Sequence, residues 1–307
     1  MQQVCSKKTI AFNFADDMYY GDSDYSGWRC GTYTETGNKI NLNIWENAYK
    51  AIRQVSIFLN NVDMNKELSE ADIIDMKGQA HFLRAYFYWI LVRTFGPVPI
   101  VPDETLDYTK EYDEISLLRN SYDECVDYIV GECVKAATML QDRRDLQEIV
   151  RPTRGAALAL RSRVLLYAAS PLHNASGVTW REAADAAYDM IEYADNGDFY
   201  RLYEDPTTPE KSYTRLFNTR ANGEVIMGFL RAPANDLYAM MPAFDPWNVN
   251  KELLTCPNQW LVDCYDMLDG SQPILGYESN TKAIINPNSG YNVNSPYANR
   301  DPRLAQS

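Results

Sequence analysis

Residues 77–102 (KGQAHFLRAYFYWILVRTFGPVPIVP) constrain the fold of this chain more than any other stretch. They predict a helix that ends at Gly96, because glycine takes a positive φ without a Cβ clash. Pro97 and Pro99 then hold the exit extended and cannot re-enter a helix. The helix carries too many rings for one core-facing stripe and is chemically inert, so it indicates a scaffold. Its rings are Phe82, Tyr86, Phe87, Tyr88, Trp89 and Phe95.

Further helices are predicted before and after this one by apolar residues at steps of three and four. Capping boxes mark the start of three of the helices, where a Ser or Thr is followed three residues later by an acidic residue. Helical hairpins in series, none able to bury its own face alone, are typical of an α-solenoid or tetratricopeptide-like array. The spacing is irregular, so the array is degenerate. The predicted helices begin near Leu42, Ser69, Ser121, Gly155 and Thr179, and the last ends at Asn196–Gly197.

The amino-acid composition changes after residue 200, where Pro, Asn and Gly become frequent. Only short strand-like runs are expected there, such as residues 224–230 (EVIMGFL), and residues 257–270 predict a short amphipathic helix ending at Asp269–Gly270. The predicted fold is mainly α: tetratricopeptide-like helical hairpins of the α-solenoid type, with a loop-rich second part containing short strands. Its three regions are a loop-rich N-terminal segment (1–41), the helical core (42–200) and a loop-rich region (201–307) that we expect to be incomplete at its C-terminus.

Composition excludes some partners. The chain has 307 residues, of which 46% are hydrophobic and 23% charged, as in an ordinary globular protein. Its net charge of −13 argues against binding to a phosphate backbone, so no nucleic-acid partner is expected. No run approaches 18 consecutive apolar residues, and MQQVCSKK at the N-terminus lacks the apolar region of a signal peptide.

The cysteines do not predict a metal site. No CxxC motif occurs, and neither histidine stands at metal-ligand spacing from a cysteine. Cys125 and Cys133 fall on an apolar helix face and are predicted to be small core residues. A disulfide framework is not expected at this length, although a Cys256–Cys264 pair stays open.

The sequence predicts neither an enzyme nor a cofactor. It contains no GxSxG, Walker, GxGxxG or HExxH pattern. His81 is expected to be a packed or hydrogen-bonded helix residue, and His173 to have a carbonyl or helix-dipole partner at a helix end. The carboxylates at 16, 17, 22 and 24 and at 263, 266 and 269 are predicted to form solvated faces or local turns rather than a glycosidase pair. A calcium loop at Asp22–Asp24 lacks EF-hand spacing.

Four segments resemble, in the same order, successive signatures of the SusD/RagB family. One departure is that the family usually has Gly-Glu-Ala-Arg where this chain has Gly78-Gln79-Ala80-His81. These are scaffold positions, so we expect altered local helix contacts rather than altered function. The segments are 45–60 (WENAYKAIRQVSIFLN), 76–101 (MKGQAHFLRAYFYWILVRTFGPVPIV), 151–174 (RPTRGAALALRSRVLLYAASPLHN), and 258–270 (NQWLVDCYDMLDG) with 299–304 (NRDPRL).

The resemblance implies a surface-exposed outer-membrane lipoprotein of Bacteroidota, built on tetratricopeptide-like helices and without catalytic residues. Such proteins bind oligosaccharides or polysaccharides (some bind peptides) and cap a SusC-type TonB-dependent transporter, to which they deliver the ligand. The lipid anchor would lie on a leader cysteine absent from this chain, and family members are much longer. Two alternatives stay open: an α-solenoid protein-interaction scaffold, and a peptide-binding member without glycan binding.

Family motifs transfer no ligand contacts, so the site is predicted from the residues. A sugar platform needs an exposed ring beside hydrogen-bonding side chains, and such sites favour loops on a rigid scaffold. Trp45, Trp89 and Trp260 lie on helical stripes and are predicted to be core, whereas Trp180 at a helix start could be either. The predicted ligand-binding residues are Trp28, Arg29, Tyr25 and Tyr33 in one loop, beside Asp22 and Asp24, and Trp247, Asn248 and Tyr238 in another.

Overall fold

The computed structural model describes residues 18–20, 44–103, 116–144, 148–173, 177–219, 222–228, 255–279 and 282–306. The chain divides into two compact units. The helical unit comprises residues 43–209 and 218–230, and the mixed unit comprises residues 1–42, 210–217 and 231–307.

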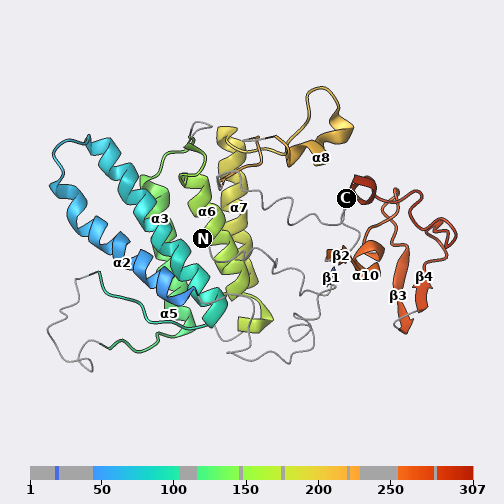
Figure 1. The fold of residues 1–307 in the computed structure, drawn as a ribbon, viewed down its shortest axis with the longest axis horizontal. Coiled ribbons are helices and arrows are strands. Elements are labelled where there is room, and N and C mark those ends of the chain that lie inside the picture. Colours follow the sequence, from blue (N-terminus) through green and yellow to red (C-terminus); the bar gives the residue numbers. More distant parts are fainter. Residues whose placement is uncertain are drawn as a thin grey trace, which may run out of the picture. The chain divides into compact units, whose positions relative to one another are not determined.

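The helical unit is an array of long α-helices that lie side by side (Figure 1). Each packs mainly against the helix before it and the helix after it in the chain: α2 on α3, α3 on α5, α5 on α6 and α6 on α7. This arrangement confirms the mainly α fold built from tetratricopeptide-like hairpins. The helices are α2 (Trp45–Asn61), α3 (Glu70–Phe95), α5 (Tyr122–Met139), α6 (Arg154–Ala168) and α7 (Trp180–Gly197), with 3₁₀ turns η3 (Val62–Met64) and η5 (Pro171–His173).

Local side chains start these helices where the sequence predicts. The Ser121 hydroxyl accepts a hydrogen bond from the Glu124 amide, and the Glu124 carboxylate accepts one from the Ser121 amide, which completes a capping box. Thr179 and Glu182 form a second reciprocal box at the start of α7. Ser69 caps α3 by accepting from the backbone of Asp72.

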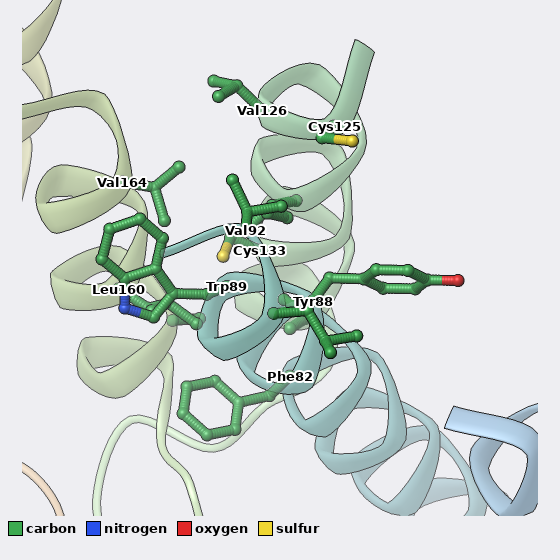
Figure 2. Packing of buried hydrophobic residues seen from close by; sticks show 14 of the residues in the cluster. Phe82, Tyr88, Trp89, Val92, Cys125, Val126, Cys133, Leu160 and Val164 are labelled. Carbon is green, nitrogen blue, oxygen red and sulfur yellow. The ribbon is translucent and has the colours of Figure 1, made fainter. Parts of the chain in front are cut away.

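The rings of α3 pack in more than one direction. Tyr88 lies edge-on to Tyr128 of α5, with ring centroids 5.1 Å apart, and also faces α2. Trp89 lies edge-on to Tyr167 of α6 at 4.9 Å. Figure 2 shows Tyr88 and Trp89 pointing to different sides of α3, with Trp89 toward α6. Neighbours therefore cover α3 on several sides, which is why its apolar residues form no single stripe. Cys125 and Cys133 are buried in the same core, as predicted.

A close approach between α3 and the end of α5 depends on Gly78. A Cβ built on Gly78 would lie 2.9 Å from Met139 Cβ and 3.1 Å from the Leu140 backbone nitrogen. Gly131, inside α5, has nothing within 4 Å of its corresponding Cβ position. The two glycines thus differ sharply in the space around them.

A buried ion pair joins α3 to α5. Arg84 and Glu132 are each 1% exposed, and Arg84 Nε donates to Glu132 Oε2 at 2.7 Å. His81 Nδ1 lies 2.8 Å from the same oxygen, and Lys135 Nζ lies 2.9 Å from Oε1. Arg84 also pairs with Asp103, which lies beyond the end of α3. As predicted, His81 is a hydrogen-bonded helix residue.

The partners of Glu132 determine its charge state. Burial alone would raise its pKa, but the hydrogen bonds from His81 and Arg84 and the Arg84 charge hold the pKa at about 2. Since the folded pKa lies below the ordinary value of 4.5, the ionised form stabilises the fold. That stabilisation is complete above the unfolded pKa and is lost as pH falls toward 2.

Among its described residues, the mixed unit has two small antiparallel ladders. β1 (Met18–Tyr20) pairs with β2 (Thr255–Pro257), with Tyr20 opposite Thr255 and Met18 opposite Pro257. β3 (Ile274–Ser279) pairs with β4 (Lys282–Ile285). Short helical segments accompany them: α8 (Ser212–Leu216), α10 (Gln259–Asp263) and α11 (Pro302–Gln306), with η6 (Pro209–Lys211) leading into α8.

Two predictions for the second half of the chain are wrong. Residues 224–228 form turns, because the Asn222 side chain accepts from the Glu224 amide and its carbonyl from the Val225 amide. The helix predicted over 257–270 covers only α10. Met267 leaves the helical path to form a β-bridge with Arg300, and Gly270 turns the chain with φ 82°.

Gly78→Ala and Gly131→Ala make a matched pair. We expect Gly78→Ala to lower the free energy of unfolding by about 1–3 kcal/mol, since Leu140 backbone cannot move aside without disturbing α5. Gly131→Ala should raise it by about 0.5–1 kcal/mol through helix propensity alone. Urea unfolding measures both, and equal effects at the two sites would contradict the close approach.

Glu132→Gln should lower the free energy of unfolding at neutral pH and make it depend less on pH in acid. At neutral pH the variant leaves the Arg84 charge buried without its carboxylate, at a cost of about 3–5 kcal/mol. Between pH 6 and pH 3 the wild type should lose about 2 kcal/mol more than the variant, because only the wild type protonates this group. Parallel pH profiles of unfolding for the two proteins would refute the assignment.

Candidate ligand-binding site

The loop residues predicted to bind ligand cannot be located. All lie outside the described residues, in segments 21–43 and 229–254. They remain predictions: Trp28, Arg29, Tyr25, Tyr33, Trp247, Asn248 and Tyr238.

The prediction that Trp260 is a core residue is wrong. Trp89 is buried and Trp45 packs against the core, as predicted. Trp260, however, is 57% exposed on α10. Its helix ends at Asp263, so the apolar stripe that would have buried the ring is never completed. Trp180, which the sequence left open, is also 57% exposed.

Trp260 and Tyr277 form an aromatic platform. The ring of Trp260 stacks on that of Tyr277 of β3, with centroids 5.2 Å apart and planes 23° apart. The Tyr277 hydroxyl donates to Asp263 Oδ2, and Gln259 Nε2 donates to Asp263 Oδ1 at 2.7 Å. A carboxylate and an amide thus lie beside two rings, one of which is largely open to solvent.

The Tyr277 phenol stays protonated at neutral pH. Partial burial and the hydrogen bond to the Asp263 carboxylate raise the pKa of Tyr277 to about 12. The proton holds the ring against Asp263, so the platform keeps one orientation across the physiological pH range.

Two hollows adjoin the platform. One has a volume of about 460 Å³ and the other about 260 Å³, and Trp260, Asp263 and Tyr277 line both. The larger volume lies within the range of small-molecule sites. Its remaining lining residues are Gln259, Ile274, Ala283, Ile285, Tyr291 and Val293.

Arg300 is hydrogen-bonded to the backbone at the end of α10, the helix that carries Trp260. Its guanidinium is buried and donates to the carbonyls of Val262 at 2.8 Å, Tyr265 at 2.6 Å and Pro296 at 2.8 Å. It also lies over the Tyr291 ring, 5.6 Å from the centroid. These bonds satisfy the carbonyls at the end of α10, where a helix leaves acceptors unpaired.

The start of α10 is tied to the N-terminal segment. The Asn258 side chain caps α10 by accepting from Leu261, and Asn258 directly follows β2, the partner strand of β1. Cys264, at the end of α10, is an exposed free thiol, so the Cys256–Cys264 disulfide that the sequence left open does not form.

The arrangement suits recognition better than catalysis. A flat ring beside a carboxylate and an amide can stack on the apolar face of a sugar and bind its hydroxyls. Among the described residues, no group of three or more His, Cys, Asp or Glu side chains could hold a metal ion. Within the same residues, no helix is long and apolar enough to cross a membrane.

Comparison with known proteins gives one family. A SusD-like profile described as starch-binding and associating with the outer membrane matches residues 1–166. SusD-like protein P25 of Formosa agariphila is 26% identical over 121 residues, which are 39% of this chain and 22% of that protein.

Solved structures share the fold. A SusD-like protein from Bacteroides fragilis matches with a TM-score of 0.73 and 21% identity, over 98% of this chain and 57% of that one. A SusD-like carbohydrate-binding protein from the same species matches with a TM-score of 0.61 and 21% identity, over 96% of this chain and 52% of that one. The chain therefore spans about half the length of these structures.

Arg300→Met should loosen the platform and leave the helical unit unchanged. Losing the hydrogen bonds to three carbonyls should lower hydrogen-exchange protection of the Cys264 and Tyr265 amides by at least about tenfold. Lys282→Met, which removes an exposed cation paired with Glu278, is the control and should change neither amide. Equal protection in the two variants would show that Arg300 does not position α10.

Proposed function

The chain belongs to the SusD-like family, and from this premise we propose that it captures oligosaccharides or polysaccharide and delivers them to a SusC-type transporter. The family description, starch-binding and associating with the outer membrane, supports the ligand class and the location. The proposal places the protein at the cell surface, held by a lipid anchor. It assigns no catalytic step to the chain.

The observation that carries the proposal is the exposed stack of Trp260 on Tyr277. A ring that is 57% exposed, held by a second ring and flanked by Asp263 and Gln259, combines the two elements of sugar recognition. The ring contributes stacking, and the polar groups contribute directional hydrogen bonds. We infer that this platform is one part of the glycan site.

The β1–β2 ladder links this platform to the two loops predicted from sequence. Trp28 follows Tyr20 by eight residues, and Trp247 precedes Thr255 by eight. Tyr20 and Thr255 are opposite one another in the ladder. In the sequence, the two predicted loops thus follow and precede a pair of residues that face each other in one ladder, which supports a site shared between the loops.

A second function is favoured by a separate surface. On α7 the side chains of Trp180, Tyr188 and Ile191 are each more than half exposed, at spacings that place them on one face of the helix. This apolar face is compatible with a protein-interaction scaffold or a peptide-binding member of the family. Either of these functions predicts that the chain binds a protein or peptide and binds no polysaccharide.

Trp260→Ala tests the leading proposal. In a panel of soluble polysaccharides, we expect the best ligand to bind the variant at least about fivefold more weakly, because one stacking surface is lost. Trp180→Ala is the matched control, since Trp180 has the same exposed fraction in the other unit, and it should retain affinity. Isothermal titration measures affinity, and circular dichroism verifies folding.

Two further results decide between the alternatives. Trp28→Ala in the same assay should leave folding intact and weaken binding; unchanged affinity would remove Trp28 from the site. If no polysaccharide binds the wild type while a SusC-type transporter co-purifies with it, the scaffold function replaces glycan capture.

A further inference from the structure

A small cavity in the helical unit is lined by arginine side chains. It has a volume of about 70 Å³ and lies between the α5–α6 connection and residues 222–226. Its described lining includes three arginines and no carboxylate, in a protein with a net charge of −13. The lining residues are Arg143, Arg144, Ile149, Arg151, Thr153, Phe199, Tyr200, Asn222, Gly223, Val225 and Ile226.

Arg144, one of the lining residues, carries an unsatisfied donor. Its side chain is 1% exposed, yet its Nη1 is buried without a hydrogen-bond partner among the described residues. The other nitrogens of the guanidinium are used: Nε donates to the Pro152 carbonyl at 2.9 Å and Nη2 to Asp75 Oδ1 at 2.6 Å. A buried charged donor without an acceptor is costly, so a partner is expected at Nη1.

The nearby carboxylates are already occupied. Asp75 Oδ2 accepts from Arg151 at 3.1 Å and from Gln79 at 2.8 Å, while its Oδ1 accepts from Arg144. Glu148 pairs with Arg151. Asp75 and Glu148 thus neutralise Arg144 and Arg151, and Arg143 is the further positive charge at the cavity.

The opposite side offers hydroxyl groups. Thr153 Oγ1 and the Tyr200 hydroxyl lie 2.8 Å apart, and both residues line the cavity. One hydroxyl of such a pair can donate to the other while the second donates to a bound acceptor. Guanidinium and hydroxyl donors around a small space are the groups that recognise an oxyanion.

We propose that this cavity binds one small oxyanion, with Arg144 Nη1 as its central donor and Arg143 and the Thr153–Tyr200 hydroxyl pair beside it. The volume holds a phosphate, a sulfate or a single carboxylate group. The segments around the cavity are already joined by bonds from the Gly228 amide to the Ile149 carbonyl and from the Arg201 amide to the Gly223 carbonyl. The anion adds a link between the α5–α6 connection and the chain after α7, independently of any glycan bound elsewhere.

The first experiment is a thermal unfolding titration of the whole chain. Sodium phosphate, sodium sulfate and sodium acetate are each added at constant ionic strength set with sodium chloride. At least one oxyanion should raise the Tm in a saturable way, and the comparison of tetrahedral with planar anions identifies the preferred class. Equal Tm values in all the salts would overturn the proposal.

Arginine variants show whether the anion that raises the Tm binds in this cavity. Arg144→Gln and Arg143→Gln should each weaken the apparent affinity for the active anion by at least about tenfold. Arg181→Gln, which removes an exposed arginine paired with Asp185 on α7, changes the net charge equally and should keep wild-type affinity. Equal weakening in all three variants would indicate charge screening and overturn the site. If Arg144→Gln does not fold, Arg143→Gln decides the outcome, because Arg143 lies on the exposed side of the cavity.

Crystals soaked in selenate give a direct readout. An anomalous peak within hydrogen-bond distance of Arg144 Nη1 supports the proposal, whereas water alone in the cavity overturns it. Asp145 follows Arg144 in the sequence and lies outside the described residues, so Asp145→Asn is the variant that tests a carboxylate of the protein itself. Oxyanion binding that appears only in Asp145→Asn would show that the protein's own carboxylate fills this position, and would likewise overturn the proposal.

Discussion

The fully buried pair of Arg84 and Glu132 sets the relative position of α3 and α5, and the remaining helices are built outward from these two. A charged pair without access to water is tolerated only where its geometry is complete, so sliding one helix along the other is heavily penalised. His81 and Lys135 supply the remaining partners of Glu132. Apolar packing around α3 is less directional, and would by itself permit neighbouring registers.

The same helix accounts for the departure from the family's Gly-Glu-Ala-Arg sequence. His81 contributes to the cluster around Glu132, whereas Gln79 bonds to Asp75 and accepts from Arg151. The two substituted positions thus remain polar contacts between α3 and its neighbours. Gly78, which is retained, lies where α3 approaches the end of α5 most closely.

Much of the helical unit could be predicted from sequence, because its signals are local. The hydroxyl of Ser121 and the carboxylate of Glu124 need only their own turn to start a helix. Residues 257–270 continue an apolar period, but Arg300, far along the chain, takes the carbonyls of Val262 and Tyr265 and ends the helix early. No local pattern reports that contact, so the exposure of Trp260 was missed. His173 likewise stacks on the Tyr122 ring, 4.3 Å between centroids, a contact between distant residues that no local pattern reports.

The ladder between Tyr20 and Thr255 has a consequence for the order of synthesis. In the sequence, the whole helical unit lies between the two strands of that ladder, which belong to the mixed unit. Contacts within the helical unit join residues near one another in the sequence, so they can form while the chain emerges from the ribosome. The mixed unit cannot form its ladder until Thr255 has been synthesised, and α10 lacks its bonds from Arg300 until that residue follows. A folded helical unit shortens the loop that the mixed unit has to close, so the stack of Trp260 on Tyr277 is assembled last.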